Sequence, residues 1–202
     1  MKERAADEPA PSINARIAQR VSSLRAERGL TLDALAAKSE VSRSMLSLVE
    51  RGESSPTAAV LERIATGLDV PLASLFEDTA VPQNPLSRAR DRSAWRDPQS
   101  GYVRKNISPP NFPSPIQIVE VELPAGAKVS YETGARDALI HQQIWIREGT
   151  LELSIGKVIH RLETDDCLAM QLNEPMTFRN RTRKPTRYIV VIASDRPRSS
   201  RR

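Results

Sequence analysis

The chain has 202 residues, 39% of them hydrophobic and 27% charged, with a net charge of +5; this length allows two small domains with separate cores, and the charge suits a polyanionic partner. Its single cysteine excludes an intramolecular disulfide and is typical of a reducing compartment. No apolar run reaches the length of a membrane helix and the polar start MKERAADEPAPS lacks a signal-peptide core, so we expect a cytoplasmic protein without a membrane partner.

The first predicted element is an amphipathic helix that follows a disordered tail, residues 1–12. Apolar residues recur at every third or fourth position, which is the spacing of one helix face. These residues are Ile13, Ile17, Val21 and Leu24. We expect Asn14 to cap this helix and Gly29 to end it, because glycine adopts the left-handed conformation without a side-chain clash.

Two short helices joined by a tight turn are predicted next. Thr31 can cap the first helix through its hydroxyl, with Asp33 near the positive end of the helix dipole, and Ser42 can cap the second. The buried positions are Leu32, Leu35, Ala36 and Ser39 in the first helix, Val41 before the second, and Leu46 and Val49 within it. The residues left facing outward are Arg43, Ser44, Ser47, Leu48 and Arg51. A helix held in this way can lie in the major groove of DNA.

Two further helical segments are predicted downstream, so that five short helices share one core over residues 13–78. Pro56 and Thr57 open a fourth helix, and Pro71 opens a last turn. The apolar residues of these segments are Leu61, Ile64, Ala65, Leu68, Leu72, Leu75 and Phe76.

The run LTLDALAAKSEVSRSMLSLVERGESSPTAAVLERIATGLDVPLASLF resembles the XRE-type helix-turn-helix domain of phage repressors and bacterial regulators, an all-α, lambda-repressor-like fold. The resemblance implies that the chain binds double-stranded DNA. By that resemblance Arg43, Ser44 and Ser47 face base edges. Ser42 and Arg51 contact phosphates, as do backbone amides at the helix starts. The whole predicted interface is Thr31, Ser42, Arg43, Ser44, Ser47, Leu48 and Arg51.

Two positions depart from the family pattern. Glu40 stands where glycine is usual, so that turn is expected to be strained, and Leu32 replaces a polar residue that commonly contacts phosphate. Glu50 is expected to pair within the protein, because phosphates repel a carboxylate. An ordinary solvated charge is the alternative for Arg43.

The excess positive charge lies outside the helical segment. It is carried by Arg88, Arg90, Arg92, Arg96, Arg104 and Lys105, and by Arg196, Arg198, Arg201 and Arg202 in a basic C-terminal tail, residues 196–202. These clusters predict non-specific DNA affinity. The equally weighted alternative is that the first cluster belongs to a solvated linker and the second to a frayed terminus, neither of which binds DNA.

The second half of the chain changes from helical to alternating periodicity. Residues 79–92 carry prolines and no apolar period, which indicates a linker. Residues 93–195 then hold short alternating segments separated by turn signals, which predict a β-barrel or sandwich. The strand residues are Ile116–Leu123, Ile140–Ile146, Leu151–Ile155, Leu168–Leu172 and Tyr188–Ala193.

The segments ELPAGAKVSYET, HQQIWIREGTLELSIGKVIHRLETDDCLAMQLNEPMTFRN and RYIVVIA resemble a cupin, a small jelly-roll barrel. Matching the cupin metal pattern places Gln142 at the glutamate position and Met176 at the last histidine. The chain's two histidines, His141 and His160, occupy no matched position, so we expect no metal, no cofactor and no catalytic residues. Cys167 is expected to be a buried small hydrophobe, with a redox sensor as the alternative.

A ligand site is predicted in the mouth of this barrel. Alternation places Ile146 on one face with Gln142 and Ile144, and the resemblance makes that face interior. The candidate ligand-binding residues are Gln142, Ile144, Met170, Met176 and Phe178. Simple core filling is the alternative for all of them, and Trp145 is a candidate for a dimer interface.

Together these features predict a transcription regulator, most simply a repressor, that binds an inverted-repeat operator as a homodimer. Its degenerate, metal-free cupin domain would bind a small-molecule effector, dimerise the protein, or both. One alternative is a metal-dependent cupin enzyme with an appended DNA-binding domain. Another is a DNA-binding protein whose barrel serves only for dimerisation.

Overall fold

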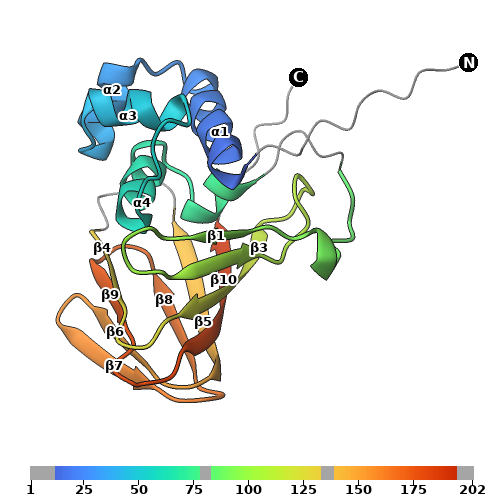
Figure 1. Ribbon diagram of the computed structural model, residues 1–202, viewed down its shortest axis with the longest axis vertical. Helices are drawn as coiled ribbons and strands as arrows, with labels where there is room; N and C mark the ends of the chain where they lie inside the picture. The colour runs from blue at the N-terminus through green and yellow to red at the C-terminus, as the bar shows by residue number, and fades with distance from the viewer. Residues whose placement is uncertain (1–11, 78–82, 133–138, 195–202) are drawn as a thin grey trace, which may run out of the picture.

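The computed structural model describes residues 12–77, 83–132 and 139–194. A helical part lies over one end of a larger β part (Figure 1). The elements of the helical part are α1 (Ile13–Glu27), α2 (Leu32–Ser39), α3 (Arg43–Glu50), α4 (Ala58–Gly67) and η1 (Leu72–Phe76), and a further short 3₁₀ helix, η2 (Ala89–Asp91), lies in the predicted linker. The five predicted segments are therefore present, and the fifth is a 3₁₀ helix.

Hydroxyl side chains cap the starts of the helices. Thr31 Oγ1 accepts from the backbone N–H of Ala34 at 3.1 Å, and Ser42 Oγ accepts from that of Met45 at 3.2 Å, as predicted. The cap predicted for α1 was wrong: the cap is Ser12, not Asn14. The helix begins at Ile13, so Asn14 already lies within its first turn, where its amide donates to Ser55 instead.

Two left-handed residues separate the first three helices. Gly29 ends α1 with φ of 62°, as predicted. Glu40 ends α2 with φ of 54°, the conformation that the missing glycine would adopt freely. For a residue with a Cβ this conformation costs about 1–2 kcal/mol, so the expected strain in this turn is present.

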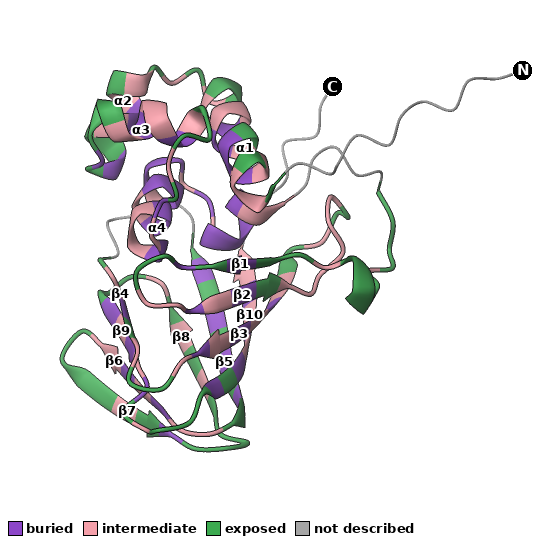
Figure 2. Cartoon of the chain, viewed as in Figure 1, coloured by how far each residue is buried: buried purple, intermediate pink, exposed green. Residues whose placement is uncertain are grey.

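The apolar positions predicted for the helical core are almost all buried (Figure 2). They are Ile17, Val21, Leu24, Leu35, Val41, Leu46, Val49, Leu61, Ile64, Ala65, Leu68, Leu72 and Leu75. Leu32, Ala36 and Phe76 are half-buried and pack against this core. Burial of these side chains compensates for helices that are too short to be stable alone.

The β part consists of two antiparallel sheets. Sheet A has the strand order β1-β2-β3-β10-β5-β8, and sheet B has the order β4-β9-β6-β7. The strands of sheet A are β1 (Ala94–Arg96), β2 (Val103–Asn106), β3 (Ile116–Leu123), β10 (Thr186–Ser194), β5 (Ile140–Glu148) and β8 (Cys167–Gln171). The strands of sheet B are β4 (Lys128–Tyr131), β9 (Met176–Arg179), β6 (Leu151–Ile155) and β7 (Val158–Leu162).

The last eight strands form a jelly roll. The pairs β3 with β10, β4 with β9, β5 with β8 and β6 with β7 nest inside one another, as in a long hairpin wound into two four-stranded sheets. This is the architecture predicted from the resemblance to cupins. The turn signals between the strands are confirmed as well: Gly126, Gly149 and Gly156 all have positive φ, and Asp165 adopts 72° where cupins usually have glycine.

Strands β1 and β2 were not predicted, because they are short and carry Arg, Lys and Asn instead of an apolar alternation. They extend sheet A beyond the jelly roll and support the helical part (Figure 1). Trp95 of β1 lies edge-on to Phe76 of η1, with ring centroids 5.4 Å apart. The buried carboxylate of Asp97 accepts from the backbone N–H of Ala58 at 2.8 Å, so the β part caps α4.

Two expectations about side-chain exposure were wrong. Cys167 is exposed, because it opens the edge strand β8 on the outer face of sheet A while Leu168 points inward. Arg104 is 5% exposed, so it belongs neither to a solvated linker nor to a free basic patch. Its strand β2 is covered by the helical part, which the sequence pattern did not reveal.

Candidate nucleic-acid interface and barrel cavity

Helix α3 presents a polar face at the end of the molecule away from the hairpin β6–β7 (Figure 1). Leu46 and Val49 anchor the opposite face in the core. On the outer side Arg43 and Ser44 are exposed, whereas Ser47 and Leu48 are half-buried. The structure therefore brings the predicted α3 residues together on one surface.

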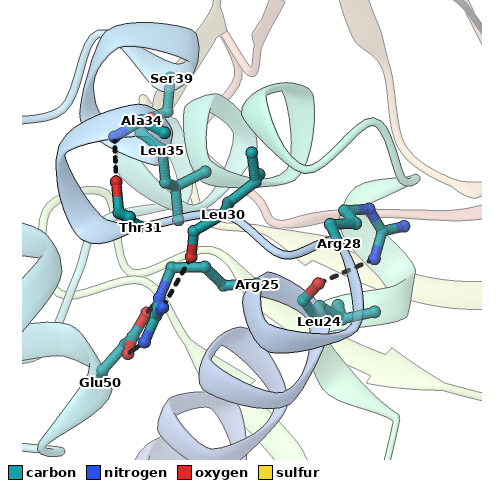
Figure 3. A network of polar contacts seen from close by, with 9 residues as sticks. All are labelled: Leu24, Arg25, Arg28, Leu30, Thr31, Ala34, Leu35, Ser39 and Glu50. Atoms are coloured by element: carbon teal, nitrogen blue, oxygen red, sulfur yellow. Dashed lines mark hydrogen bonds and ion pairs between the residues drawn. The ribbon is translucent and has the colours of Figure 1, made fainter.

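A bidentate ion pair fixes α3 against α1 (Figure 3). Arg25 Nε donates to Glu50 Oε1 at 2.6 Å, and Arg25 Nη2 donates to Glu50 Oε2 at 2.7 Å. Arg25 Nη1 also donates to the carbonyl of Leu30 at 2.9 Å, so the same guanidinium holds the connection into α2. The hydrogen bond to Glu50 raises the pKa of Arg25. The expected intramolecular role of Glu50 is confirmed.

Arg43 lies between the starts of the two short helices. Its Nε is 3.1 Å from Oδ1 of Asp33 in the first turn of α2. Both side chains are more than half exposed, at 65% and 75%. An exposed pair of this kind contributes about 0–1 kcal/mol, so a base or a phosphate can replace Asp33 at low cost.

The other predicted contact residues surround this position. Arg51 follows α3 and forms a bidentate pair with Glu53 at 2.9 and 2.8 Å, which raises the pKa of Arg51 and lowers that of Glu53. Arg51 also donates to the hydroxyl of Ser47. Thr31 and Ser42 are exposed caps at two helix starts, where backbone N–H groups face solvent. Together these groups can hold phosphate oxygens on either side of α3.

A second candidate site is a cavity of about 50 Å³ at the end of the jelly roll nearest the helices. Three of the predicted ligand-binding residues line it: Gln142, Met176 and Phe178. Ile144 and Met170 do not line it. Ile144 is fully buried further along β5, and Met170 is a half-buried residue opposite Gln142 on the edge strand β8.

The inward positions that hold metal ligands in cupins carry other chemistry here. Gln142 and Met176 are both buried, whereas His141 faces outward on β5 and His160 lies on β7 in the other sheet. Over residues 12–77, 83–132 and 139–194, no three His, Cys, Asp or Glu side chains gather closely enough to hold a metal ion.

The cavity residues that were not predicted from the sequence include Tyr102, Arg104, Tyr131 and Tyr188. Tyr188 was predicted only as the start of a strand. The other three lie on or beside β2 and β4, which have too few apolar residues to show an alternation. All three tyrosines of the chain line the cavity, but they lie far apart in the sequence and gave no signal of it.

Comparisons with known proteins agree with this arrangement. The helix-turn-helix family HTH_3 matches residues 21–75. The chain is 30% identical over 157 residues to the HTH-type transcriptional regulator SutR of Escherichia coli, which covers 78% of this chain and 83% of SutR. It is 36% identical over 63 residues to the HTH-type transcriptional regulator SinR of Bacillus subtilis, covering 31% of this chain and 57% of SinR.

A solved structure extends the similarity to both parts of the molecule. The crystal structure of an HTH_3 family transcriptional regulator from Vibrio cholerae matches with a TM-score of 0.71 at 25% identity, covering 92% of this chain and 98% of that chain. Among the helices described here, none combines the length and the apolar character needed to cross a membrane.

Proposed function

Because this chain belongs to the XRE-type helix-turn-helix transcriptional regulators with a cupin-type second domain, we propose that it acts in the cytoplasm as a dimeric repressor of an inverted-repeat operator. The proposal divides the chain into a DNA-binding domain (13–78), a linker (79–92) and an effector or dimer domain (93–195). Its main support is the exposed polar face of α3, which the pair of Arg25 and Glu50 holds away from the β part.

The proposed DNA contacts follow from the geometry of that face. The N-terminal half of α3 enters the major groove, so that Arg43 exchanges Asp33 for a base edge and Ser44 and Ser47 lie over neighbouring bases. The half-buried Leu48 suits the methyl group of a thymine. The contacts to phosphates are assigned to Thr31, Ser42 and Arg51, which surround the start and end of the helix.

Dimerisation is proposed through the outer face of sheet A. Apolar side chains occupy neighbouring positions across four strands there, in a row that no helix of the described chain covers. They are Ile116, Ile118, Trp145, Cys167, Ile189 and Val191. Trp145 is 39% exposed within this face and Ile116 is 46% exposed at the start of β3, and large apolar side chains exposed together on one surface mark interaction sites. A self-complementary patch of this kind gives the two-fold symmetry that an inverted repeat requires.

The jelly roll is proposed to bind an effector without metal chemistry or catalysis. SutR and SinR are named as transcriptional regulators, and the inward positions that hold metal ligands in cupins carry Gln142 and Met176 in this chain. The competing hypothesis is a metal-dependent cupin enzyme. Stoichiometric iron, manganese or zinc in purified protein, with loss of the bound metal on replacing Gln142 by leucine, would favour that hypothesis.

The proposal is tested by two matched pairs of variants. Replacing Arg43 by alanine should weaken operator binding by about 1–3 kcal/mol in a gel-shift titration. Arg161→Ala removes the same charge from β7 and should leave affinity unchanged. In light scattering, Trp145→Glu should produce monomers, whereas Val158→Glu, on the exposed strand β7, should not. Equal affinities of Arg43→Ala and Arg161→Ala would contradict the DNA contact of Arg43. Equal molecular masses of Trp145→Glu and Val158→Glu would contradict the dimer interface on sheet A.

A further inference from the structure

Arg104 places a positive charge inside the molecule, and no carboxylate of the described residues forms an ion pair with it. Its side chain lies on the inner face of β2, stacked on the ring of Phe76 with Cζ 5.0 Å from the ring centroid. Its single hydrogen bond is a long one, 3.4 Å from Nη1 to the hydroxyl of Tyr102. Nε and Nη2 are buried and have no hydrogen-bond partner. Buried charges are ordinarily paired, because removal from water costs several kcal/mol per ion, roughly.

Three further polar side chains line the same cavity without a hydrogen-bond partner among the described residues: Gln142, Tyr131 and Tyr188. Burial raises the pKa of both tyrosines well above the ordinary value, so each keeps its proton and can donate it in a hydrogen bond. The cavity therefore presents several donors from different strands. The remaining wall is apolar and includes Val190, Ile192, Met176 and Phe178. A few convergent polar groups in an apolar wall are typical of small-molecule sites.

We propose that this cavity binds a small monocarboxylate, with the guanidinium of Arg104 as its anion contact. This inference rests on the proposed function, since it assigns a chemical class to the effector of the regulator. The planar guanidinium matches a carboxylate in a two-pronged hydrogen bond. The nearby hydroxyls and the amide of Gln142 supply the remaining donors that an anion needs.

The volume of the cavity and the charged side chains that line it favour a small monocarboxylate over other anions. Since one water-sized group occupies about 10–15 Å³, the cavity of about 50 Å³ accepts roughly four such groups. A carboxylate with one to three further carbon atoms fits this space and its apolar wall. The buried side chain of Glu62 also lines the cavity, so a doubly charged phosphate meets about twice the repulsion that a monoanion meets.

The cavity lies where a ligand can act on the DNA-binding domain. Glu62 and Leu72 belong to that domain. Arg104 lies on the added strand β2, and Gln142 and Tyr188 belong to the jelly roll. Phe76 of η1 stacks on the same guanidinium that would hold the anion. A carboxylate therefore has contacts with both domains, and it favours whichever domain arrangement keeps these contacts.

The test uses the full chain without DNA, so it is decided independently of operator binding. Thermal unfolding is measured with acetate, propionate and butyrate, each against its neutral amide at equal concentration and equal ionic strength. At least one carboxylate should raise Tm by about 2–6 °C above its amide. Arg104→Gln should abolish this difference, and Arg181→Gln, which removes a surface charge, should retain it.

Three results would overturn the inference. Equal effects of every carboxylate and its amide would show that the charge is not recognised. An equal shift with inorganic phosphate would contradict the monocarboxylate class. A retained carboxylate response in Arg104→Gln would remove Arg104 from the site. If that variant does not unfold cooperatively, the comparison of carboxylate with amide in the unaltered protein still decides the proposal.

Discussion

The ion pair between Arg25 and Glu50 should be one of the strongest single polar contributions to the helical domain. Its side chains are 21% and 10% exposed, so water screens it far less than a surface pair. Replacing Glu50 by glutamine keeps the shape but removes the charge that Arg25 pairs with. A hydrogen bond to a charged group contributes about 1.5–3 kcal/mol, and Arg25 keeps its bond to Leu30, so we expect a loss of about 2 kcal/mol.

Thermal unfolding followed by circular dichroism measures this loss. For a chain of this size about 2 kcal/mol corresponds to a fall in Tm of roughly 4–8 °C. The control is Glu163→Gln, which breaks the exposed pair of Arg161 and Glu163 on the jelly roll, with side chains 74% and 65% exposed. That change should lower Tm by less than about 4 °C, because exposed pairs contribute only about 0–1 kcal/mol.

A double-mutant cycle measures the interaction energy between Arg25 and Glu50 apart from their contacts with other residues. Arg25→Met and Glu50→Gln combined should destabilise the protein by about 1–2 kcal/mol less than the sum of the two single changes. Equal Tm values for Glu50→Gln and Glu163→Gln, or strictly additive single changes, would refute the idea that this pair holds α3 in place.

Three further outcomes are expected. Glu40→Gly should raise stability by about 0.5–1 kcal/mol in denaturant unfolding, because glycine adopts the left-handed turn without strain; a loss of stability would contradict the strain. Asp97→Ala should cost about 2 kcal/mol, since the buried carboxylate that caps Ala58 is lost, and an unchanged midpoint of urea unfolding would show that this contact between the domains is unimportant. Arg181→Gln should raise the pKa of Glu152, measured by NMR titration, because the hydrogen bond from Arg181 now holds that pKa below its ordinary value. In the unaltered protein the stabilisation from this pair is therefore present above about pH 4.5 and is lost as the pH falls through the depressed pKa. If the pKa of Glu152 stays low in the variant, the hydrogen bond from Arg181 is not what lowers it.

The helical domain could be predicted from the sequence because its signals are local. Thr31 and Ser42 are caps, Gly29 is a left-handed stop, and each acts on residues within one turn of itself. The missed cap of α1 follows the same rule, since Ser12 and Asn14 both suit the position and only the backbone decides between them.

The jelly roll could be predicted where apolar and polar side chains alternate along a strand over many residues. It could not be predicted where contacts between the domains decide which side chains are buried. On β5 alternation places Gln142 on one face with Ile144 and Ile146, and the resemblance to cupins identified that face as interior. Arg104 reads as a linker charge in the sequence, because nothing local shows that η1 covers its strand. Cys167 reads as buried because it adjoins an apolar run, yet it opens an edge strand on the outer face.

The central claim, that α3 reads DNA as part of a symmetric dimer, is tested most directly by selecting binding sites from random double-stranded DNA. We expect the selected sites to form an inverted repeat with half-sites about one helical turn apart. Selection with Arg43→Ala should lose the preference at one base in each half-site, whereas Arg161→Ala should keep every preference. Selected sequences without two-fold symmetry, or an identical set with Arg43→Ala, would contradict it.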